Sequence, residues 1–379
     1  MDVFFSLKGV PTNSCILLST REEALDYPRG DIQMAFCPSC GFISNMAFDP
    51  NLTEYSGRYE ETQGFSETFN SFHRRLAERL IDRYDLHDKS VLEIGCGKGE
   101  FITILAELGN NRGVGFDPGY REERTSEALT GRLKFVKDFY SDKYSDYQAD
   151  FVCCKMTLEH IHPTSQFIST VRRAIGDNFD TVVFFQIPEV LRIIRDCAFE
   201  DIYYEHCSYF SPGSLGRLFR QNGFDVINLE TEYAGQYLTI EAKPSRNTPT
   251  SPLEMEDDLS LLAQYVSEFP TKCQNKLAEW RQLVQAAHAA GQKIVLWGSG
   301  SKGVSFLTTL GVGDSIEYAV DINPHRHGYY MPTTGQRIVA PDFLKKYQPD
   351  IVIIMNSVYR DEITRDLGGL GLQPKILAL

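Results

Sequence analysis

The feature that most constrains this chain is a pattern that it contains twice: a short apolar run, a glycine-rich loop and a segment with helical periodicity. The first copy, VLEIGCGKGEF, runs from Val91 to Phe101, and the second, KIVLWGSGSKG, begins at Lys293. Glycine lets the backbone approach a ligand closely, and a helix that begins there presents free N–H groups. Both copies therefore predict a strand–loop–helix unit with a ligand at the end of the strand.

The sequence around the first copy alternates between apolar runs of strand length and helical patterns. The runs are SVLEIG, RGVGFD, LKFVKD, ADFVCC and TVVFFQI, and the helical patterns include GEFITILAELG and TSQFISTVRRAIG. This alternation predicts a parallel sheet with helices on both faces. The stretch KPSRNTPTSPLEMEDD, at 243–258, has the composition of a linker. We expect an α/β protein in four parts: a small N-terminal lobe with cysteines at 1–70, an α/β domain at 71–245, a linker with a helical segment at 246–290, and a second α/β domain at 291–379.

Composition limits the partners of the chain. Its 379 residues include 38 basic and 51 acidic side chains, which gives a net charge of -13. Such an acidic surface argues against nucleic acid and anionic membranes as partners, and no apolar run approaches the ~20 residues of a membrane span. The N-terminus lacks the pattern of a signal peptide, and Cys153 and Cys154 lie in an apparently buried strand. We expect a cytoplasmic protein, a monomer or weak dimer, that acts on a small molecule.

The first glycine loop has acidic residues before and after it. Glu93 lies inside the strand, Gly95 and Gly97 follow, and Asp117 ends the next strand. A carboxylate at the position of Asp117 is suited to accept hydrogen bonds from ribose hydroxyls. A tight strand–helix turn would also explain the glycines, and a dinucleotide fingerprint does not require Glu93.

The E-x-G-x-G-x-G form of this loop resembles the first motif of class I S-adenosylmethionine (SAM) methyltransferases. Two later segments agree with the resemblance: Asp138-Phe139 ends the next strand-like run, and Leu158-Glu159-His160-Ile161 follows ADFVCC. The resemblance implies a Rossmann-like domain that binds SAM. The residues assigned to the cofactor are Tyr59, Ser66, Glu93, Gly95, Cys96, Gly97, Asp117, Pro118, Asp138, Phe139 and Lys155.

A second cluster, DIYYEHCSYF at 201–210, gathers aromatic and titratable side chains after the strand TVVFFQI. On a loop at the ends of strands, His206 could abstract a proton near neutral pH. Glu205 could orient or charge His206, and Tyr203 could donate a hydrogen bond to an oxyanion. An aromatic cap over the sheet, with His206 satisfied by its neighbours, would explain the same residues without chemistry.

The whole chain resembles the C-methyltransferases that act on nucleotide-linked keto-deoxysugars, which combine a zinc lobe, a SAM domain and a C-terminal Rossmann-like domain. Their Y-H-E-H-x-x-Y run is matched here by YYEHCSY, with Tyr204 in place of the first histidine. The resemblance implies that His206 removes a proton next to a ketone and that Tyr203 stabilises the enolate. The residues assigned to the substrate are Glu159, His160, Tyr209, Lys302 and Arg326.

The same family places two features before the SAM domain. A tyrosine-containing segment folds over the cofactor, and YSGRYEETQGFS, with Tyr55, is its counterpart. Two C-x-x-C pairs bind zinc; the chain keeps Cys37-Pro-Ser-Cys40, but the earlier pair is reduced to Cys15. A tetrahedral zinc site needs four ligands. Cys15, Cys37 and Cys40 are therefore the candidate zinc ligands, and loss of the metal is the alternative.

The second glycine loop, Trp297 to Gly303, is followed by Asp321 at the end of the next strand. Alone, this spacing would indicate an NAD-dependent oxidoreductase. In the family that the chain resembles, the corresponding domain helps to bind the nucleotide of the sugar, which makes Lys302, Arg326 and Asn356 the candidate phosphate or base contacts.

We therefore expect a SAM-dependent methyltransferase that methylates carbon next to the ketone of a nucleotide-linked sugar or a related small biosynthetic intermediate. An unactivated C–H is too weak an acid for histidine, so a ketone must lie beside the reacting carbon. Three alternatives stay open: an O- or N-methyltransferase, an NAD-dependent oxidoreductase, and a scaffold that keeps SAM or a nucleotide as a structural ligand.

Overall fold

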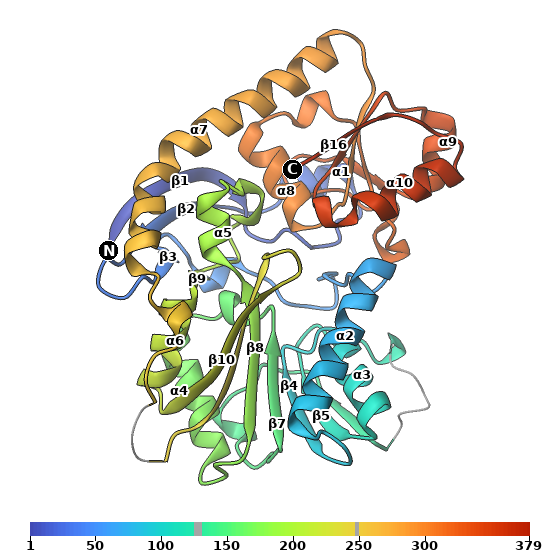
Figure 1. Cartoon of the computed structure of the whole chain (residues 1–379). Helices are drawn as coiled ribbons and strands as arrows, with labels where there is room; N and C mark the ends of the chain where they lie inside the picture. Colours follow the sequence, from blue (N-terminus) through green and yellow to red (C-terminus); the bar gives the residue numbers. More distant parts are fainter. Residues whose placement is uncertain (125–130, 247–249) are drawn as a thin grey trace.

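The structure, a computed structural model, describes residues 1–124, 131–246 and 250–379. It contains three sheets, which Figure 1 shows with the largest below and the C-terminal domain above. The linker predicted at 243–258 falls partly on residues 247–249, which lie outside the described residues. None of the described helices is both long and apolar enough to cross a membrane.

The central sheet has seven strands in the order β10-β11-β8-β7-β4-β5-β6. The strands from β4 to β8 are parallel, as the alternation predicted, and β11 pairs antiparallel with β8 and β10. This sheet and the second parallel sheet described below confirm the predicted fold class, a class I methyltransferase domain with a further Rossmann-like domain. The bounds are β4 Ser90–Ile94, β5 Arg112–Phe116, β6 Leu133–Val136, β7 Phe151–Lys155, β8 Val182–Pro188, β10 Phe224–Glu232 and β11 Tyr237–Pro244.

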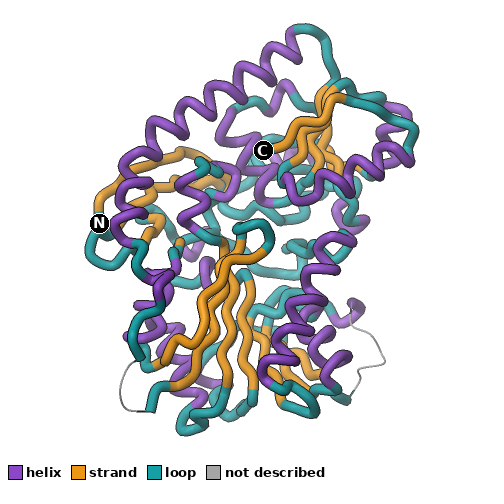
Figure 2. Tube along the Cα trace, in the orientation of Figure 1, coloured by secondary structure: helices purple, strands orange, loops and turns teal. Residues whose placement is uncertain are grey.

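Helices cover both faces of this sheet because its strands are apolar on both sides. Cys153 packs with α2 and α3, whereas its neighbour Cys154 packs with α4 and α6 on the opposite face. Figure 2 shows these helices on either side of the strands. Their bounds are α2 Glu67–Tyr84, α3 Glu100–Gly109, α4 Thr164–Ile175 and α6 Pro212–Gln221.

The C-terminal sheet is entirely parallel, in the order β14-β13-β12-β15-β16. The runs KIVL, IEYAVD and DIVIIMN supply its three central strands, and one further short strand lies at each edge, β14 beside β13 and β16 beside β15. The bounds are β12 Ile294–Trp297, β13 Tyr318–Val320, β14 Arg337–Val339, β15 Ile351–Ile354 and β16 Lys375–Ala378; α8 is Ser301–Leu310, α9 Leu344–Tyr347 and α10 Arg360–Gly369.

A four-stranded sheet in the order β1-β2-β3-β9 is built mainly from the N-terminal lobe. Its strands are β1 Asp2–Pro11, β2 Arg29–Phe36, β3 Ile43–Asn45 and β9 Ser208–Tyr209, and α1, Arg21–Leu25, lies between β1 and β2. Strand β9 comes from the α/β domain predicted at 71–245 and begins two residues after His206. Its pairing with β3 holds the loop before it between two sheets.

One hydrophobic core joins the N-terminal sheet to the C-terminal domain. It includes residues of β2, of α5 (Val190–Arg195), of the long helix α7 (Leu259–Ala289) and of β12 and α8. Phe269 of α7 is fully buried, and the rings of Phe4 and Phe5 meet it edge-on at centroid distances of 5.8 and 5.2 Å. In Figure 1, α7 runs along the N-terminal sheet towards the C-terminal domain.

Phe269→Ala should therefore lower the free energy of unfolding by about 3–5 kcal/mol, because it removes a large buried ring and leaves a cavity. Urea denaturation followed by circular dichroism measures the change. Leu261→Ala, in the same helix at a side chain that is 44% exposed, is the control and should change the free energy of unfolding by less than about 0.5 kcal/mol. Equal effects of the two substitutions would contradict the shared core.

Candidate active site

A cavity of about 600 Å³ lies between the carboxyl ends of the central strands and those of the C-terminal sheet. Both glycine loops line it, through Gly95 and Gly97 on one side and Gly298 and Gly300 on the other. Ligands of open α/β sheets bind at these ends of the strands. The two patterns that the sequence repeats therefore meet at one cavity.

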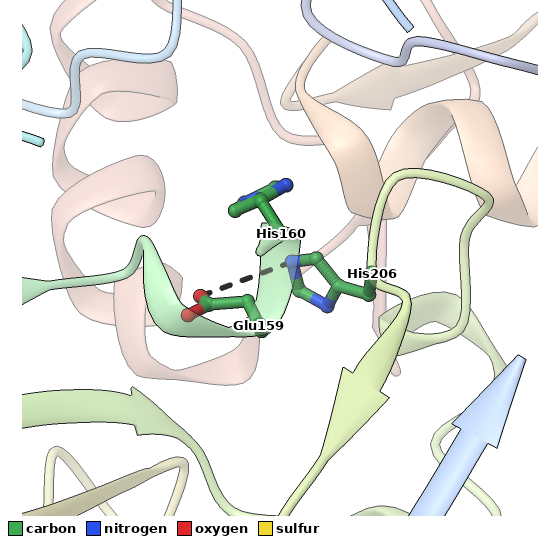
Figure 3. Close-up of side chains that lie close together, drawn as sticks. All are labelled: Glu159, His160 and His206. Atoms are coloured by element: carbon green, nitrogen blue, oxygen red, sulfur yellow. Dashed lines mark ion pairs between the residues drawn. The ribbon is translucent and has the colours of Figure 1, made fainter. Parts of the chain in front are cut away.

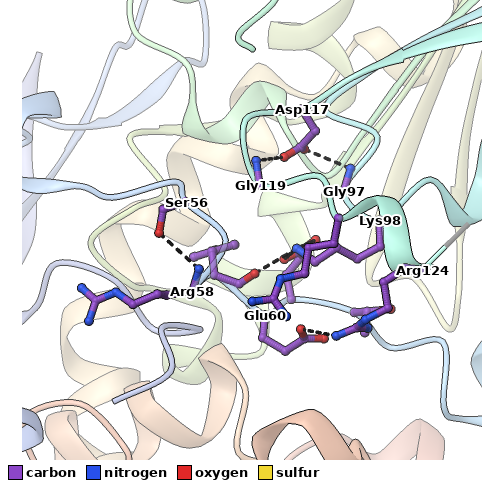
Figure 4. Close-up of polar contacts among 12 residues, drawn as sticks. Ser56, Arg58, Glu60, Gly97, Lys98, Asp117, Gly119 and Arg124 are labelled. Atoms are coloured by element: carbon purple, nitrogen blue, oxygen red, sulfur yellow. Dashed lines mark hydrogen bonds and ion pairs between the residues drawn. The ribbon is translucent and has the colours of Figure 1, made fainter. Parts of the chain in front are cut away.

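The backbone of the first glycine loop passes close to neighbouring atoms at positions where a side chain would not fit. Gly95 has a φ of 68°, and a Cβ there would lie 2.1 Å from Thr157 Oγ1. The carboxylate of Asp117 accepts hydrogen bonds from the backbone N–H groups of Gly97, at 2.9 Å, and Gly119, at 2.7 Å (Figure 4). Burial, helped by the charge of Glu61, raises the pKa of Asp117 to about 6. Cys96 and Pro118 line the cavity beside these residues.

The segment between Thr53 and Gln63, which we call the tyrosine segment, is fastened across this loop. Lys98 Nζ donates to the carbonyl oxygen of Tyr59 at 2.9 Å and pairs with Glu61 at 3.1 Å. Glu60 pairs with Arg124 at 2.9 Å, as Figure 4 shows. Tyr55 and Tyr59 both line the cavity.

Lys155, at the end of β7, belongs to a buried polar group in the cavity wall. Its Nζ lies 2.7 Å from His73 Nε2 and 4.4 Å from the centroid of the Phe101 ring. Glu93 accepts a hydrogen bond from the backbone N–H of Ile102 at 3.0 Å. Burial raises the pKa of Glu93 and lowers those of Lys155 and His73. His73 was not predicted as a site residue, although it is a titratable residue on the apolar side of a helix.

His206 lies in the cavity wall and is 2% exposed. The ring of Tyr203 is 4.0 Å from it between centroids, and that of His160 is 4.8 Å away. Burial and the nearby His160 lower the pKa of His206, so its imidazole is neutral near pH 7. Tyr209 meets the same ring edge-on from behind and does not line the cavity. His160 is held by the hydroxyl of Tyr55, 2.9 Å from its Nδ1.

Glu159, in a 3-10 turn at 158–160, is the carboxyl group that faces His206 (Figure 3). Its Oε1 lies 3.9 Å from His206 Nε2, and neither carboxyl oxygen has a hydrogen-bond partner. Burial raises the pKa of Glu159 to about 8. The sequence analysis placed Glu159 in the substrate wall but did not connect it with His206.

The expected role of Glu205 as the partner of His206 is wrong. Its carboxylate accepts hydrogen bonds from Asn13 Nδ2 at 2.9 Å, Tyr59 O–H at 3.1 Å, and the backbone N–H of Ser14 at 3.2 Å, and it does not line the cavity. Adjacent side chains of the loop point to opposite sides, so Glu205 ties the loop to the N-terminal lobe while His206 faces the cavity.

Two expected phosphate contacts already have protein partners. Lys302 Nζ lies 2.5 Å from both carboxylate oxygens of Asp201, which also pairs with Arg192. Arg326 donates to the carbonyl oxygens of Ser299, at 3.1 Å, and Glu60, so it joins the second glycine loop to the tyrosine segment. All of these side chains except those of Ser299 and Glu60 line the cavity. Asp201 is thus shared by two cations in the cavity wall.

Three further cofactor candidates line the cavity with partners of their own. Ser66 caps α2 by accepting from the backbone N–H of Phe69, and it donates to Glu362. Asp138 bonds Tyr144 and pairs with Lys143, while Phe139 is 60% exposed, which leaves its ring available for stacking.

The three candidate zinc ligands do not come together. Cys15 lies in the cavity wall, with its Sγ 3.3 Å from Ser301 Oγ. Cys37 and Cys40 lie in the turn between β2 and β3, and within the described ranges no third histidine, cysteine or carboxylate joins them. A zinc site built from Cys15, Cys37 and Cys40 therefore does not fit this structure.

The described part of the chain holds one group of three such side chains, Glu159, His160 and His206, whose polar atoms lie within 4.8 Å of one another. The 3.9 Å between Glu159 Oε1 and His206 Nε2 is wider than the separation of about 3.4 Å expected between ligands of a tetrahedral zinc ion. We therefore treat the group as an acid–base cluster.

Comparison with known families matches two segments of the chain. Residues 68–229 match the family model described as a methyltransferase domain, and residues 239–370 match the model of a C-methyltransferase C-terminal domain. The chain is a SAM-dependent methyltransferase. The two matched segments of this methyltransferase contain one glycine loop each, so its cavity lies between them.

Individual proteins are similar to this methyltransferase over different shares of its length. The C-methyltransferase NovU of Streptomyces niveus is 24% identical over 364 residues, which cover 92% of this chain and 85% of that protein. The ribosomal protein L11 methyltransferase of Haemophilus influenzae is 28% identical over 140 residues, 35% of this chain and 42% of its own. Among solved structures, magnesium protoporphyrin IX methyltransferase of Synechocystis PCC 6803 covers 47% of this chain and 84% of its own, with 16% identity and a TM-score of 0.37.

We expect the affinity of the methyltransferase for SAM to fall as the pH drops through about 6. Asp117 must be ionised to accept hydrogen bonds from ribose hydroxyls, and its raised pKa means that it takes up a proton in this range. Calorimetric titration with SAM between pH 5 and 8 measures the change. Asp117→Asn should bind SAM weakly at every pH; a variant that kept the wild-type pH dependence would contradict the role of Asp117.

Proposed function

We propose that this methyltransferase transfers the methyl group of SAM to a carbon next to a ketone, in a nucleotide-linked sugar or a related small biosynthetic intermediate. The observation that carries the proposal is the position of His206, whose neutral imidazole lies in the wall of a cavity that both glycine loops line. A neutral base beside the methyl donor is what C-methylation requires. The similarity to NovU, named a C-methyltransferase, supports the same chemistry.

The reaction follows from these residues in two steps. His206 takes the proton from the carbon next to the ketone, and the electrons of the broken C–H bond form the enolate. The enolate carbon then attacks the methyl group that SAM supplies, and the S–CH3 bond breaks with its electrons left on sulfur. Tyr203, whose ring packs on His206, lies where its hydroxyl could donate to the enolate oxygen.

A cluster of two cations and one carboxylate in the cavity wall supports a phosphorylated substrate. Arg192 and Lys302 share the single carboxylate of Asp201, and Arg192 Nε is buried without a partner. Two cations that flank one carboxylate, one of them with a buried N–H group left to donate, can bind phosphate oxygens. We propose that this cluster, with Asn356 in the same wall, faces the nucleotide part of the substrate.

His206→Asn should lower methylation by about 10²–10⁴-fold and leave SAM binding intact, since only the base is removed. The assay supplies SAM with a ¹³C-labelled methyl group and thymidine-diphosphate-linked 4-keto-6-deoxyglucose, and NMR locates the methyl group in the product. His87→Asn, at an exposed histidine in the loop after α2, is the matched control.

Two outcomes would contradict the proposal. A methyl group found on oxygen or nitrogen would indicate the O- or N-methyltransferase alternative. A fully active His206→Asn variant would exclude His206 as the base.

A further inference from the structure

Glu159 is buried in a way that needs explanation. It is 1% exposed, it lines the cavity, and both of its carboxyl oxygens lack a hydrogen-bond partner. A buried carboxyl group without partners costs free energy. Two other buried acids avoid this cost: Glu205 accepts several hydrogen bonds, and Glu60 is bonded to Arg124 and Asn323. An unpartnered group in a cavity wall points to a partner supplied by the substrate.

The surroundings of Glu159 determine its charge. The titratable groups that face it come from the tyrosine segment, from β7, from its own turn and from the loop that leads into β9: Tyr55, Cys154, His160, Tyr203, His206, Cys207 and Tyr209. Burial raises the pKa of the tyrosines and cysteines among them and lowers that of the histidines, so all are neutral near pH 7. No cation therefore offsets the burial of Glu159, whose pKa rises to about 8.

Glu159 lies next to His206, so a proton on its carboxyl group could be donated to the same substrate. The two groups are 3.9 Å apart, too far for a hydrogen bond between them, and both border the cavity. The reacting carbon and the carbonyl oxygen of one ketone are only two bonds apart. A base and a hydrogen-bond donor that are close neighbours can therefore reach both atoms of the same substrate.

We propose that Glu159 is protonated in the resting enzyme and donates a hydrogen bond to the carbonyl oxygen of the substrate as that oxygen becomes the enolate, while His206 takes the proton from the adjacent carbon. This inference rests on the proposed function. Glu159 keeps its own proton throughout. The methyl transfer then consumes the enolate, and the proton on His206 leaves to solvent before the next turnover.

The proposed reaction uses one acid, Glu159, and one base, His206, and burial shifts their pKa values in opposite directions. Burial disfavours the charged form of each, so the acid keeps its proton and the base stays free of one. Both groups are therefore in the reactive form at the same pH. A neutral donor also avoids placing a second negative charge beside the enolate.

Infrared spectroscopy tests the protonation state without any substrate. The difference spectrum between the wild type and Glu159→Gln, both with S-adenosylhomocysteine, should contain the C=O stretch of a protonated carboxyl group at pH 6 and lose it by pH 9.5. Glu60→Gln is the control, because Asn323 and Arg124 lower the pKa of Glu60 against its burial. Its difference spectrum should show a carboxylate. A carboxylate spectrum for Glu159 at pH 6 would overturn the proposal.

Kinetics test the role of the proton. Glu159→Leu should lower kcat by about 10²–10³-fold, the range for loss of one oxyanion donor, with unchanged SAM affinity. The kcat of the wild type should fall as the pH rises through about 8, because the ionised form of Glu159 cannot donate. Glu159→Gln, whose amide donates at every pH, should lack this decline. A Gln variant that kept the wild-type profile would refute the donor role.

The two proposals fail in different ways. A wild type that shows the protonated carboxyl band but methylates none of the nucleotide-linked keto sugars would contradict the proposed substrate and leave the charge state of Glu159 established. A wild type that methylates carbon, together with a fully active Glu159→Leu variant, would contradict the role of Glu159 alone.

Discussion

The site depends on the hydrophobic core that joins the N-terminal sheet, helix α7 and the C-terminal sheet. This core holds the C-terminal domain against the open ends of the central strands, where an isolated methyltransferase domain would face water. Side chains in the wall of the resulting cavity, such as Glu159 and His206, are therefore almost fully buried. Burial is the main reason why the pKa of Glu159 rises while that of His206 falls.

The parts of the fold that local sequence determines were predictable. The glycine loops, the parallel strands and the helices between them follow from short apolar runs and helical periodicity. The hairpin of β10 and β11 was not predicted, because its strands have no helix between them and pair antiparallel through the turn after Glu232. The apolar run CILLST, at 15–20, forms only isolated bridges, such as that of Ile16 with Tyr59, because its partners lie in irregular segments.

Most of the residues expected at the candidate site line the cavity, but the pairings between their side chains were not predicted. Sequence proximity suggested that Glu205 serves His206, yet neighbouring side chains of a loop point apart, and Glu159, 47 positions earlier, faces the imidazole instead. The family resemblance suggested that Lys302 contacts phosphate, yet Asp201 already pairs with it. Such pairings join residues from different elements, so only the packing of those elements determines them.

The hydrogen bond between the hydroxyl groups of Ser14 and Ser301, at 2.7 Å, has a consequence for how the protein is made. The ribosome releases Ser14 early, but its partner follows 287 residues later. Domains usually fold as soon as they have been synthesised. The segment around Ser14 also donates hydrogen bonds to the carboxylate of Glu205. Its polar groups find all of their partners only after the C-terminal domain has been synthesised. The cavity is thus among the last parts of the molecule to form. A chain that stops before α8 would contain the central sheet but would lack the C-terminal residues that line the cavity.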